Sequence, residues 1–476
     1  MEGFVGGTEI QLGVQRLHPE FSVTTDYDNA VKELIDANSK LNIYGIRGTG
    51  TEGGQYINWL FNGGLLYHDL QHPEYATPEC RSLKDIINYE FAGRRITQSL
   101  IELVTRPLKT QGFAQYGVFA NNVDHYLAAD QQIGYPLRPT VFAYHENYAA
   151  TNPVAEVDLL LPFLVTRHVF AGAGFVLQKE LREKWKTDFL IAQRAAAVYA
   201  QGSALKVGLF SFLAGESRHN TKILHITVGD ANVSPYATRL KIGTTILVHQ
   251  LIEKGWKPPL FLIASSPDTL VGNARSLCIF NSSFRWMCRF SDRSISAIDV
   301  QRIYLEAAWD RFAGRDPETD WTLLAWMETL DQLERDPMEC VKLDWVLKKR
   351  YLDDRGHRLT SAEQVRFDIA YHAANPQKSA FLALAKHYGV DDLPNEETIE
   401  HAIKEPPTNT RALGRSLAVR AISKQNGQEI PHITWSGIQF KGQHLPMPSP
   451  SDTYQKASML FAKNLEQLSS SKERRG

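Results

Sequence analysis

Polar and apolar residues alternate near the start of the chain, in the stretch GGTEIQLGV. Thr8, Ile10 and Leu12 fall on one side of this alternation, whereas Glu9 and Gln11 fall on the other. A period of two is typical of a β-strand that packs one face against a core. The sequence therefore predicts a strand that carries an acid and an amide side by side on its polar face.

Helical periodicity appears in three longer stretches, each with a start or stop signal. Apolar residues recur every three or four positions, and a Ser, Thr or Gly stands at one end of each stretch. The predicted helices span residues 82–106, 236–255 and 360–374, and the apolar runs 224–230 and 258–266 are predicted strands. Because strands and helices do not alternate regularly, the pattern favours an α+β fold over a doubly wound parallel sheet.

Composition changes near residues 373–380, AANPQKSA, and the end of the chain is rich in proline and serine. We therefore expect a large domain over residues 1–375 and a small C-terminal domain over residues 376–445. Residues 446–476 are predicted to form a mobile tail around one short amphipathic helix.

The charges of the 476-residue chain nearly balance, with 52 Lys and Arg against 53 Asp and Glu. This balance argues against general binding of nucleic acid or of a membrane surface. The four cysteines have neither metal-site nor disulfide spacing, so we expect reduced thiols. The sequence shows no N-terminal signal and no apolar run of the roughly 18 residues that a membrane span needs. We therefore expect a cytoplasmic protein without nucleic-acid or membrane partners.

The stretch LYHDLQHPEYATPEC concentrates candidate chemistry in a few positions. Tyr67 and Asp69 are two residues apart, so on a strand they share one face. We expect Pro73 to interrupt the strand ladder and to allow a bend that returns Glu74 toward the same space. Carboxylates that converge repel each other unless a cation lies among them, and Mg²⁺ prefers such oxygen ligands. Solvated loop carboxylates are the more frequent use of such residues, so spacing alone leaves both interpretations open.

Other polar residues add to this picture. YHENY contains His145 and Glu146, and FANNVD ends on Asp124. For His72 and His145, structural hydrogen bonding is the favoured interpretation over metal ligation. The glycine-rich stretch IRGTGTEGG lacks the lysine and serine of a phosphate loop and is interpreted as a flexible linker.

The order of several longer motifs carries a resemblance that covers residues 5–440. The chain resembles the Pup ligase and Pup deamidase/depupylase family, which is related to glutamine synthetase and the carboxylate-amine ligases, in the segments GTEIQLG, LYHDLQHPEYATPEC, NNVD, HENY, LLPFLVTRHVFAGAGFVLQ, AQR, LHITVGDAN, LKIGTTILV, DPMEC, LDWVLKKR and PPTNTRALGRS. The resemblance implies a glutamine synthetase-like large catalytic domain, with a curved antiparallel sheet packed by helices, and a small C-terminal domain.

The same resemblance implies cofactors and a partner. The cofactors are ATP (or ADP) and Mg²⁺, and the partner is a small disordered Pup-like protein modifier or its conjugates. The reaction concerns the side-chain carboxyl or amide at the C-terminus of that modifier. A ligase of this family phosphorylates a glutamate and passes the acyl group to a lysine, whereas its sister hydrolyses a C-terminal glutamine or an isopeptide bond.

Carried over position by position, the resemblance implies roles for six residues: the magnesium ligands Glu9, Tyr67 and Glu74, the catalytic aspartate Asp69, and the nucleotide-contacting positions Thr77 and Trp435. An aspartate beside metal-bound phosphates can accept a proton or attack an acyl carbon. An indole can stack on a purine. The plain alternatives are a solvated Glu9 on a sheet surface and a Trp435 in ordinary core packing.

Four further charged residues have competing interpretations. Glu79 is expected to be an acid at the start of the following helix. Arg194, Arg411 and Arg415 are candidates for phosphate binding, although arginines on solvated faces are more frequent.

The chain also departs from the family pattern. Gln11 stands where the family has a second glutamate, so we expect weaker metal binding or a shifted ion. Leu65 stands where the family has an arginine, which removes one phosphate contact. Residues 211–220, SFLAGESRHN, replace the family segment TRDEPHAD.

The direction of the reaction rests on finer likenesses. The three-residue step from Asp69 to His72 and the segments QRIYLE and DQLERDPMEC look more like the deamidase/depupylase branch. The loop before the catalytic aspartate is shorter than is typical of that branch. An ATP- and Mg²⁺-dependent hydrolase is therefore expected first, a ligase second, and a catalytically degenerate relative that binds the modifier or a nucleotide third.

Overall fold

The computed structural model describes residues 1–17, 27–50, 56–110, 115–128, 138–151, 153–194, 217–218, 221–280, 286–425 and 429–473. The chain divides into two compact units, which are described separately. The helical unit comprises Met1–Phe4, Phe119–Glu216 and Lys222–Pro394, and the sheet unit comprises Val5–Val118, Ser217–Thr221 and Asn395–Gly476. These limits do not coincide with the predicted domain borders at residues 375 and 445.

An antiparallel sheet forms the centre of the sheet unit. Its neighbouring strands are, in order, β1 (Gly6–Gln11), β6 (His72–Ala76), β5 (Leu65–Asp69), β4 (Ile57–Leu60) and β3 (Gly45–Arg47). As the alternation predicts, Thr8 and Ile10 are buried while Glu9 is half-buried, but Gln11 on the polar face is also buried. The predicted first strand is therefore confirmed.

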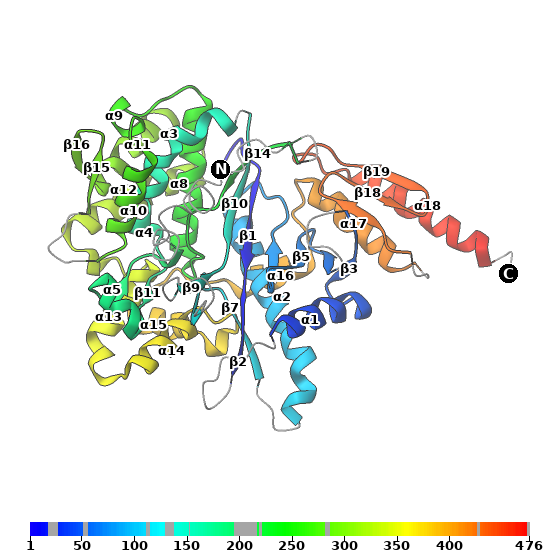
Figure 1. Ribbon diagram of the computed structural model, residues 1–476. Helices are drawn as coiled ribbons and strands as arrows, with labels where there is room; N and C mark the ends of the chain where they lie inside the picture. Colours follow the sequence, from blue (N-terminus) through cyan, green and yellow to red (C-terminus); the bar gives the residue numbers. More distant parts are fainter. Residues whose placement is uncertain are drawn as a thin grey trace. The chain divides into compact units, whose positions relative to one another are not determined.

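Two helices, α1 (Tyr27–Leu41) and α2 (Leu83–Thr110), pack on the strands of this sheet (Figure 1). Helix α2 matches the helix predicted at residues 82–106, and the Ser82 hydroxyl accepts a hydrogen bond from the Asp85 amide at 3.0 Å. Gly93 of α2 lets the helix approach β6 closely, because a Cβ there would lie 2.1 Å from the ring of Tyr75. This contact fixes the apolar face of β6 against the helix.

The C-terminal part of the sheet unit contains a small three-stranded sheet, β17 (His432–Thr434), β18 (Gly437–Phe440) and β19 (Gln443–Pro446). Helices α17 (Arg411–Ser423) and α18 (Gln455–Glu473) run beside each other and beside this sheet (Figure 1). The segment predicted as a mobile tail thus contains a packed helix, since Phe461 and Leu465 of α18 are buried in a core with Trp59. The unit also contains α16 (Glu396–Lys404), β13 (Ser217–Arg218) and the paired strands β2 (Gly13–Leu17) and β7 (Gln115–Phe119).

The helical unit is dominated by helices. They are α3 (Pro153–Thr166), α4 (His168–Ala171), α5 (Lys179–Trp185), α8 (Pro235–Glu253), α9 (Leu260–Ile263), α10 (Pro267–Leu277), α11 (Ala297–Phe312), α12 (Pro317–Arg335), α13 (Asp344–Arg355), α14 (Ser361–Tyr371) and α15 (Ala380–His387), with the 3₁₀ turns η2 (Pro337–Glu339), η3 (Gly356–Arg358) and η4 (Pro376–Lys378). Its antiparallel strand pairs are β8 (Val123–Ala128) with β9 (Arg138–Val141), β10 (Tyr144–Ala149) with β14 (Thr221–Ile226), β11 (Phe175–Val176) with β12 (Phe189–Leu190), and β15 (Met287–Phe290) with β16 (Arg293–Ser296).

Most predictions for this unit are confirmed. Helix α8 begins after the N-cap Ser234, and α14 has the expected capping box between Thr360 and Glu363. The predicted strand at residues 258–266 is wrong, because α9 starts directly after Pro259. Proline presets the φ angle of a helix start, and a short apolar run does not by itself distinguish a strand from a buried helix.

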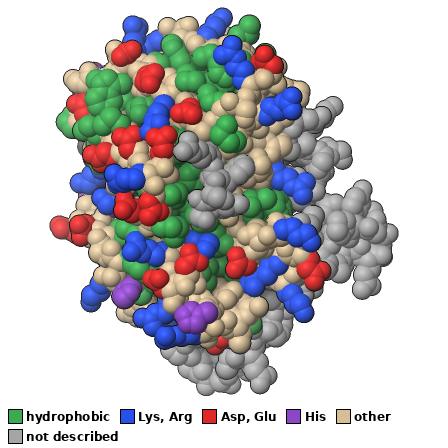
Figure 2. All heavy atoms as spheres, turned by 90° about the vertical axis from the view of Figure 1, so that its left-hand side faces the viewer, with side chains coloured by type: hydrophobic (Ala, Val, Ile, Leu, Met, Phe, Trp, Pro, Cys, Tyr) green, Lys and Arg blue, Asp and Glu red, His purple; other side chains and the backbone are tan. Residues whose placement is uncertain are grey.

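An antiparallel sheet packed by helices, with a small C-terminal sheet, confirms the predicted α+β class. All four cysteines are buried and free, as expected for reduced thiols. Among the described residues, no helix is long and apolar enough to cross a membrane. On the face drawn in Figure 2, basic and acidic side chains are interspersed, in keeping with the net charge of −1.

Candidate active site

Three neighbouring strands of the sheet unit bring the predicted acidic residues onto one face. In the strand register, Gln11 of β1 lies opposite Glu74 of β6, and Glu74 lies opposite Tyr67 of β5. Two residues further along β5, Asp69 is paired with His72. Directly opposed residues of antiparallel strands point to the same side, so these side chains form adjacent rows. Glu9, Tyr67, Asp69 and Glu74 are called the acidic cluster below.

Hydrogen bonds join the members of the acidic cluster. Glu74 is only 2 % exposed, and its carboxyl accepts a hydrogen bond from the Tyr67 hydroxyl and lies within hydrogen-bonding reach of Asp69. The Gln11 amide nitrogen donates to Asp69 Oδ2 at 2.5 Å. Gln11, expected only as a lost metal ligand, is therefore also the residue that orients Asp69. Its place on the same strand face as Glu9 was the signal for this contact.

Neighbouring carboxylates raise the pKa of two members of the acidic cluster. Burial, followed by repulsion from Glu9 and Asp69, raises the pKa of Glu74 well above its usual value. Burial and the carboxylates of Glu9 and Glu74 likewise raise the pKa of Tyr67. Carboxylate and phenol oxygens are hard donors of the kind that Mg²⁺ prefers. The donor set therefore fits a magnesium ion, which would offset the repulsion among these groups.

The turn between β5 and β6 departs from the prediction for Pro73. The chain reverses at Leu70 and Gln71, which have positive φ angles of 43° and 72°, and Pro73 lies within β6 opposite His68. The expectation that Pro73 bends the chain is therefore wrong, since a two-residue hairpin turn returns Glu74 toward Tyr67. Turns of this kind need positive φ and are usually signalled by Asn or Gly, but Leu and Gln occupy these two positions here.

His72 has a structural role at the same turn, as favoured from the sequence. The Pro73 carbonyl accepts a hydrogen bond from the Leu12 amide at 3.0 Å, but proline has no N–H to return to the Leu12 carbonyl. His72 Nδ1 lies 3.2 Å from that carbonyl oxygen and can donate to it instead. Burial lowers the pKa of His72, so the neutral ring that makes this bond is favoured.

The two predicted nucleotide-contacting residues have described contacts outside the acidic cluster. Thr77 follows β6 directly, and its hydroxyl accepts a hydrogen bond from the Thr8 amide at 3.0 Å. Trp435 lies in the turn between β17 and β18, half-buried, with its ring 5.1 Å from that of Trp59 in an edge-to-face arrangement. Their nucleotide contacts stay predictions.

Glu79 belongs to a buried ion-pair group rather than to a helix start, because α2 begins only at Leu83. Arg411 Nε donates to Glu79 Oε1 at 2.6 Å, and Arg415 donates to both carboxylate oxygens. Burial alone would raise the pKa of Glu79, but Arg415 and then Arg411 lower it to about 2. These two arginines, considered for phosphate binding, already have carboxylate and carbonyl partners. Glu79, Arg411 and Arg415 are called the arginine clasp below.

Leu65 lies on the same face of β5 as Tyr67, two residues earlier, and is 3 % exposed. Its side chain belongs to the core that contains Trp59 and Ile433. The position where the family resemblance implies an arginine is therefore an apolar core position here, which agrees with the expected loss of a phosphate contact.

In the helical unit, residues of the resembling motifs form buried polar contacts. Glu146 of HENY is fully buried and forms a bidentate ion pair with Arg167, with Nη2 to Oε1 at 2.5 Å and Nη1 to Oε2 at 3.1 Å. The Asp230 carboxylate accepts hydrogen bonds from the amides of Gln193 and Arg194. These contacts explain Glu146 and Asp230 as structural residues of this unit.

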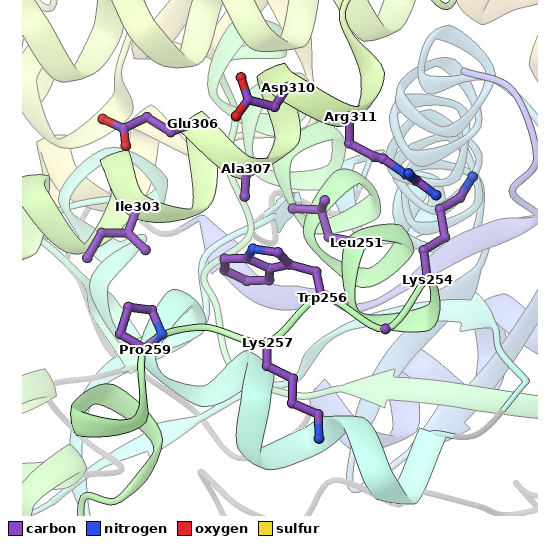
Figure 3. Close-up of a pocket in the computed structure, with 11 residues that line it drawn as sticks. Leu251, Lys254, Trp256, Lys257, Pro259, Ile303, Glu306, Ala307, Asp310 and Arg311 are labelled. Atoms are coloured by element: carbon purple, nitrogen blue, oxygen red, sulfur yellow. The ribbon is translucent and has the colours of Figure 1, made fainter.

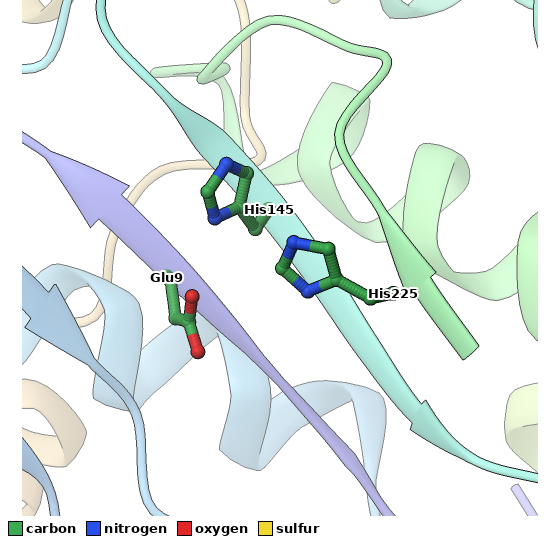
Figure 4. Close-up of side chains that lie close together, drawn as sticks. All are labelled: Glu9, His145 and His225. Carbon is green, nitrogen blue, oxygen red and sulfur yellow. The ribbon is translucent and has the colours of Figure 1, made fainter. Parts of the chain in front are cut away.

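His145 and His225 come from the neighbouring strands β10 and β14, and their ring centroids lie 4.6 Å apart (Figure 4). His225 Nδ1 is 2.7 Å from the Asn147 side-chain oxygen, a structural hydrogen bond between the two strands. Glu9, also drawn in Figure 4, belongs to the sheet unit. The side chain of Asp124 and most of the replaced segment 211–220 lie outside the described residues.

A family model described as Pup-ligase protein matches residues 24–439, which is most of the chain. This chain belongs to the Pup ligase family. The recognised resemblance is thereby confirmed, and the quoted motifs that carried it span both compact units.

Curated relatives in the family carry two different names. A Pup–protein ligase of Rhodococcus opacus (strain B4) is 30 % identical over 403 residues, covering 81 % of this chain and 84 % of the relative. A Pup deamidase/depupylase of Mycolicibacterium smegmatis is 30 % identical over 397 residues, covering 80 % of this chain and 74 % of the relative. Equal identity to both does not distinguish the two branches of the Pup ligase family.

Two solved structures show the fold of the family. The complex of Pup with its ligase PafA matches with a TM-score of 0.81 at 22 % identity, covering 99 % of this chain and 94 % of the other. The Pup ligase PafA in complex with ADP matches with a TM-score of 0.73 at 23 % identity, covering 94 % and 96 %. The fold class predicted from the sequence is thus the fold of Pup ligase family members.

The helical unit also contains a surface pocket of about 860 Å³ (Figure 3). It lies between the end of α8 and helix α11, with Trp256 at its centre and the charged side chains of Lys254, Glu306 and Arg311 around it. Helix α8 itself is almost entirely buried, so its apolar stripe is a core feature. The mixed charges of the pocket favour no single class of ligand.

Proposed function

We propose that this chain is an ATP- and Mg²⁺-dependent enzyme that acts on the C-terminal side-chain carboxyl or amide of a small, disordered Pup-like protein modifier. The observation that carries this proposal is the acidic cluster on one face of β1, β6 and β5. Membership in the Pup ligase family supports the modifier as substrate, and the likeness to a Pup ligase with ADP supports the nucleotide.

Glu9, Tyr67 and Glu74 are the residues that would hold Mg²⁺, and Thr77 and Trp435 those that would contact the nucleotide. A bound Mg²⁺ would offset the negative charge of the nucleotide phosphates and the charge that develops on the reacting acyl group. Gln11 contributes no charge at its place in the row, so the site has one carboxylate fewer than the family pattern. We therefore expect magnesium binding to be weaker than in relatives with a second glutamate.

Asp69 is proposed as the catalytic residue. The Gln11 amide holds one carboxylate oxygen at 2.5 Å, and this contact fixes the orientation of the group. In hydrolysis, Asp69 either removes a proton from water or attacks the amide carbon directly. In ligation, it removes a proton from the lysine amine that attacks the activated glutamyl group. Both directions need the same ionised carboxylate at the edge of the acidic cluster.

We propose hydrolysis as the main direction, because residues 301–306 and 331–340 resemble the deamidase/depupylase branch. Ligation is the second candidate, because the match extends over 84 % of a Pup–protein ligase but 74 % of a Pup deamidase/depupylase. A degenerate relative that only binds the modifier or nucleotide is the third. The free, buried thiols agree with a cytoplasmic location.

One set of assays distinguishes these candidates. The full chain is incubated with ATP and Mg²⁺ and with a Pup-like modifier ending in Gln, one ending in Glu, or a modifier–lysine conjugate. Release of ammonia or cleavage of the conjugate identifies the hydrolase. Formation of a conjugate with consumption of ATP identifies the ligase. Nucleotide binding without any of these reactions would contradict both enzymatic candidates and favour a degenerate relative that only binds the modifier or nucleotide.

A further inference from the structure

Arg415 of α17 is a fully buried arginine whose five N–H donors are all used. Its Nε and Nη2 donate to the Gly63 carbonyl at 3.0 and 2.8 Å, and Nη1 and Nη2 donate to the two carboxylate oxygens of Glu79. The remaining Nη1 hydrogen bond goes to the Trp435 carbonyl at 3.2 Å. One guanidinium thus joins the β4–β5 turn, the residues after β6 and the β17–β18 turn.

The side chain of Trp435 is held by the same group. The Arg415 guanidinium carbon lies 4.7 Å from the centroid of the Trp435 ring and 5.3 Å from that of Trp59. Trp59 is fully buried and meets Trp435 edge to face, so it supports the ring from the core side. Trp435 is only half-buried, so part of its surface is exposed to solvent. Arg415 therefore contacts both the backbone and the ring of Trp435 and holds them in position.

We infer that Arg415 is a positioning residue, which holds the Trp435 ring in the orientation needed to stack on the base of the bound nucleotide. This inference rests on the proposed function, in which Trp435 contacts the nucleotide. Glu79 acts through Arg415, because its carboxylate fixes the guanidinium in the plane that reaches Trp435. The tryptophan's affinity for a base is thereby linked to an ion pair more than three hundred residues apart in the chain.

Arginine suits this role because its planar fork donates in five fixed directions, whereas lysine donates from a single nitrogen. Arg411 provides a matched comparison on the same helix. It also donates to Glu79 and is buried, but its other hydrogen bonds go to the carbonyls of Met447 and Pro448. A general weakening of the clasp should therefore follow from a change at either arginine, whereas misplacement of Trp435 should follow only from a change at Arg415.

The test compares Arg415→Lys with Arg411→Lys by isothermal titration of the full chain with ADP and Mg²⁺. Arg415→Lys should weaken ADP binding at least about fivefold, the lower end of what one base–aromatic stack contributes. Arg411→Lys should leave ADP affinity near wild type, although thermal unfolding should report lower stability for both variants. In a Trp435→Ala background, Arg415→Lys should have no further effect on ADP affinity, because the two residues act through one contact.

Glu79→Asp serves as the second variant if Arg415→Lys does not fold, since it keeps both charges but withdraws the carboxylate by one methylene. It should weaken ADP binding in the wild-type background and not with Trp435→Ala. Equal loss of affinity in Arg411→Lys and Arg415→Lys, or an additive loss with Trp435→Ala, would overturn the positioning role. Absence of ADP binding by the wild-type chain would instead overturn the proposed function itself.

Discussion

Glu74 and Glu79 lie five residues apart in the same stretch of chain, and both side chains are largely buried, but their surroundings are opposite. Burial, followed by repulsion from the carboxylates of Glu9 and Asp69, raises the pKa of Glu74. Glu79 faces Arg415 and Arg411, so its pKa is lowered to about 2. Arginines of the chain supply the counter-charge of Glu79, whereas the charged groups that raise the pKa of Glu74 are two further carboxylates.

This difference separates a structural acid from a functional one. Burying a carboxylate is costly unless charges and hydrogen bonds compensate it. The arginine clasp compensates Glu79 within the chain and joins α17 to the sheet of the same unit. In the acidic cluster, the Tyr67 hydroxyl donates to Glu74 and the Gln11 amide donates to Asp69. We propose that Mg²⁺ binds where the carboxylates of the acidic cluster repel one another.

The largest expected effect is on the reaction rate. Asp69→Asn keeps the shape of the side chain but removes proton acceptance and attack, so turnover should fall about 10²- to 10⁴-fold. Thermal unfolding and ADP binding should stay close to wild type. Asp353→Asn, at an exposed aspartate of α13, is the matched control and should leave turnover unchanged. Wild-type turnover in Asp69→Asn would show that Asp69 is not the catalytic residue.

The next effect concerns the arginine clasp. Glu79→Gln removes the carboxylate and leaves two buried guanidinium groups without their ion partner, which should cost about 3–5 kcal/mol of unfolding free energy. Denaturant unfolding of the full chain measures this loss. A change below about 1 kcal/mol would mean that Glu79 is exposed enough to behave as a surface ion pair.

The arginine clasp should also make the free energy of unfolding depend on pH in the acid range. The pKa of Glu79 is lowered from 4.5 to about 2 in the folded protein. Its stabilisation is therefore present above about pH 4.5 and is lost as the pH falls toward 2, an effect of about 3 kcal/mol. Unfolding free energies measured from pH 6 downward should show this slope in wild type and a shallower one in Glu79→Gln. Parallel curves for the two proteins would contradict the lowered pKa of Glu79 in the folded protein.

The matching change in the acidic cluster should have the smallest effect on stability, and of opposite sign. Glu74→Gln removes a carboxylate that Glu9 and Asp69 repel, so unfolding free energy without Mg²⁺ should stay unchanged or rise by up to about 1 kcal/mol. The measurement is denaturant unfolding in the presence of a chelator. A loss comparable to that of Glu79→Gln would remove the contrast between the two glutamates.

Much of the acidic cluster follows from local periodicity. The alternation along β1 predicts Glu9 beside Gln11, the spacing along β5 predicts Tyr67 beside Asp69, and the strand register confirms both pairs on one face. The hairpin turn at Leu70 and Gln71 was missed because neither residue signals positive φ. A proline in a strand suggested a bend, whereas the His72 ring replaces the hydrogen bond that Pro73 lacks.

Local sequence patterns did not predict the arginine clasp. Glu79 meets Arg415 from more than three hundred residues away, and no periodicity links the two. The packing of helix α18 was not predicted for a similar reason. Its proline- and serine-rich flanks suggest mobility, whereas Phe461 and Leu465 pack into a core built by distant residues. Contacts that depend on tertiary packing need the structure.

The central claim is that the acidic cluster binds Mg²⁺ together with a nucleotide, and isothermal titration of ADP into the full chain with and without Mg²⁺ tests it most directly. Wild type should release heat of binding at millimolar ADP only when Mg²⁺ is present, Glu74→Gln should lose most of it, and Asp353→Asn should retain it. Equal heats from wild type and Glu74→Gln, or no heat from wild type at millimolar ADP with Mg²⁺, would contradict the account.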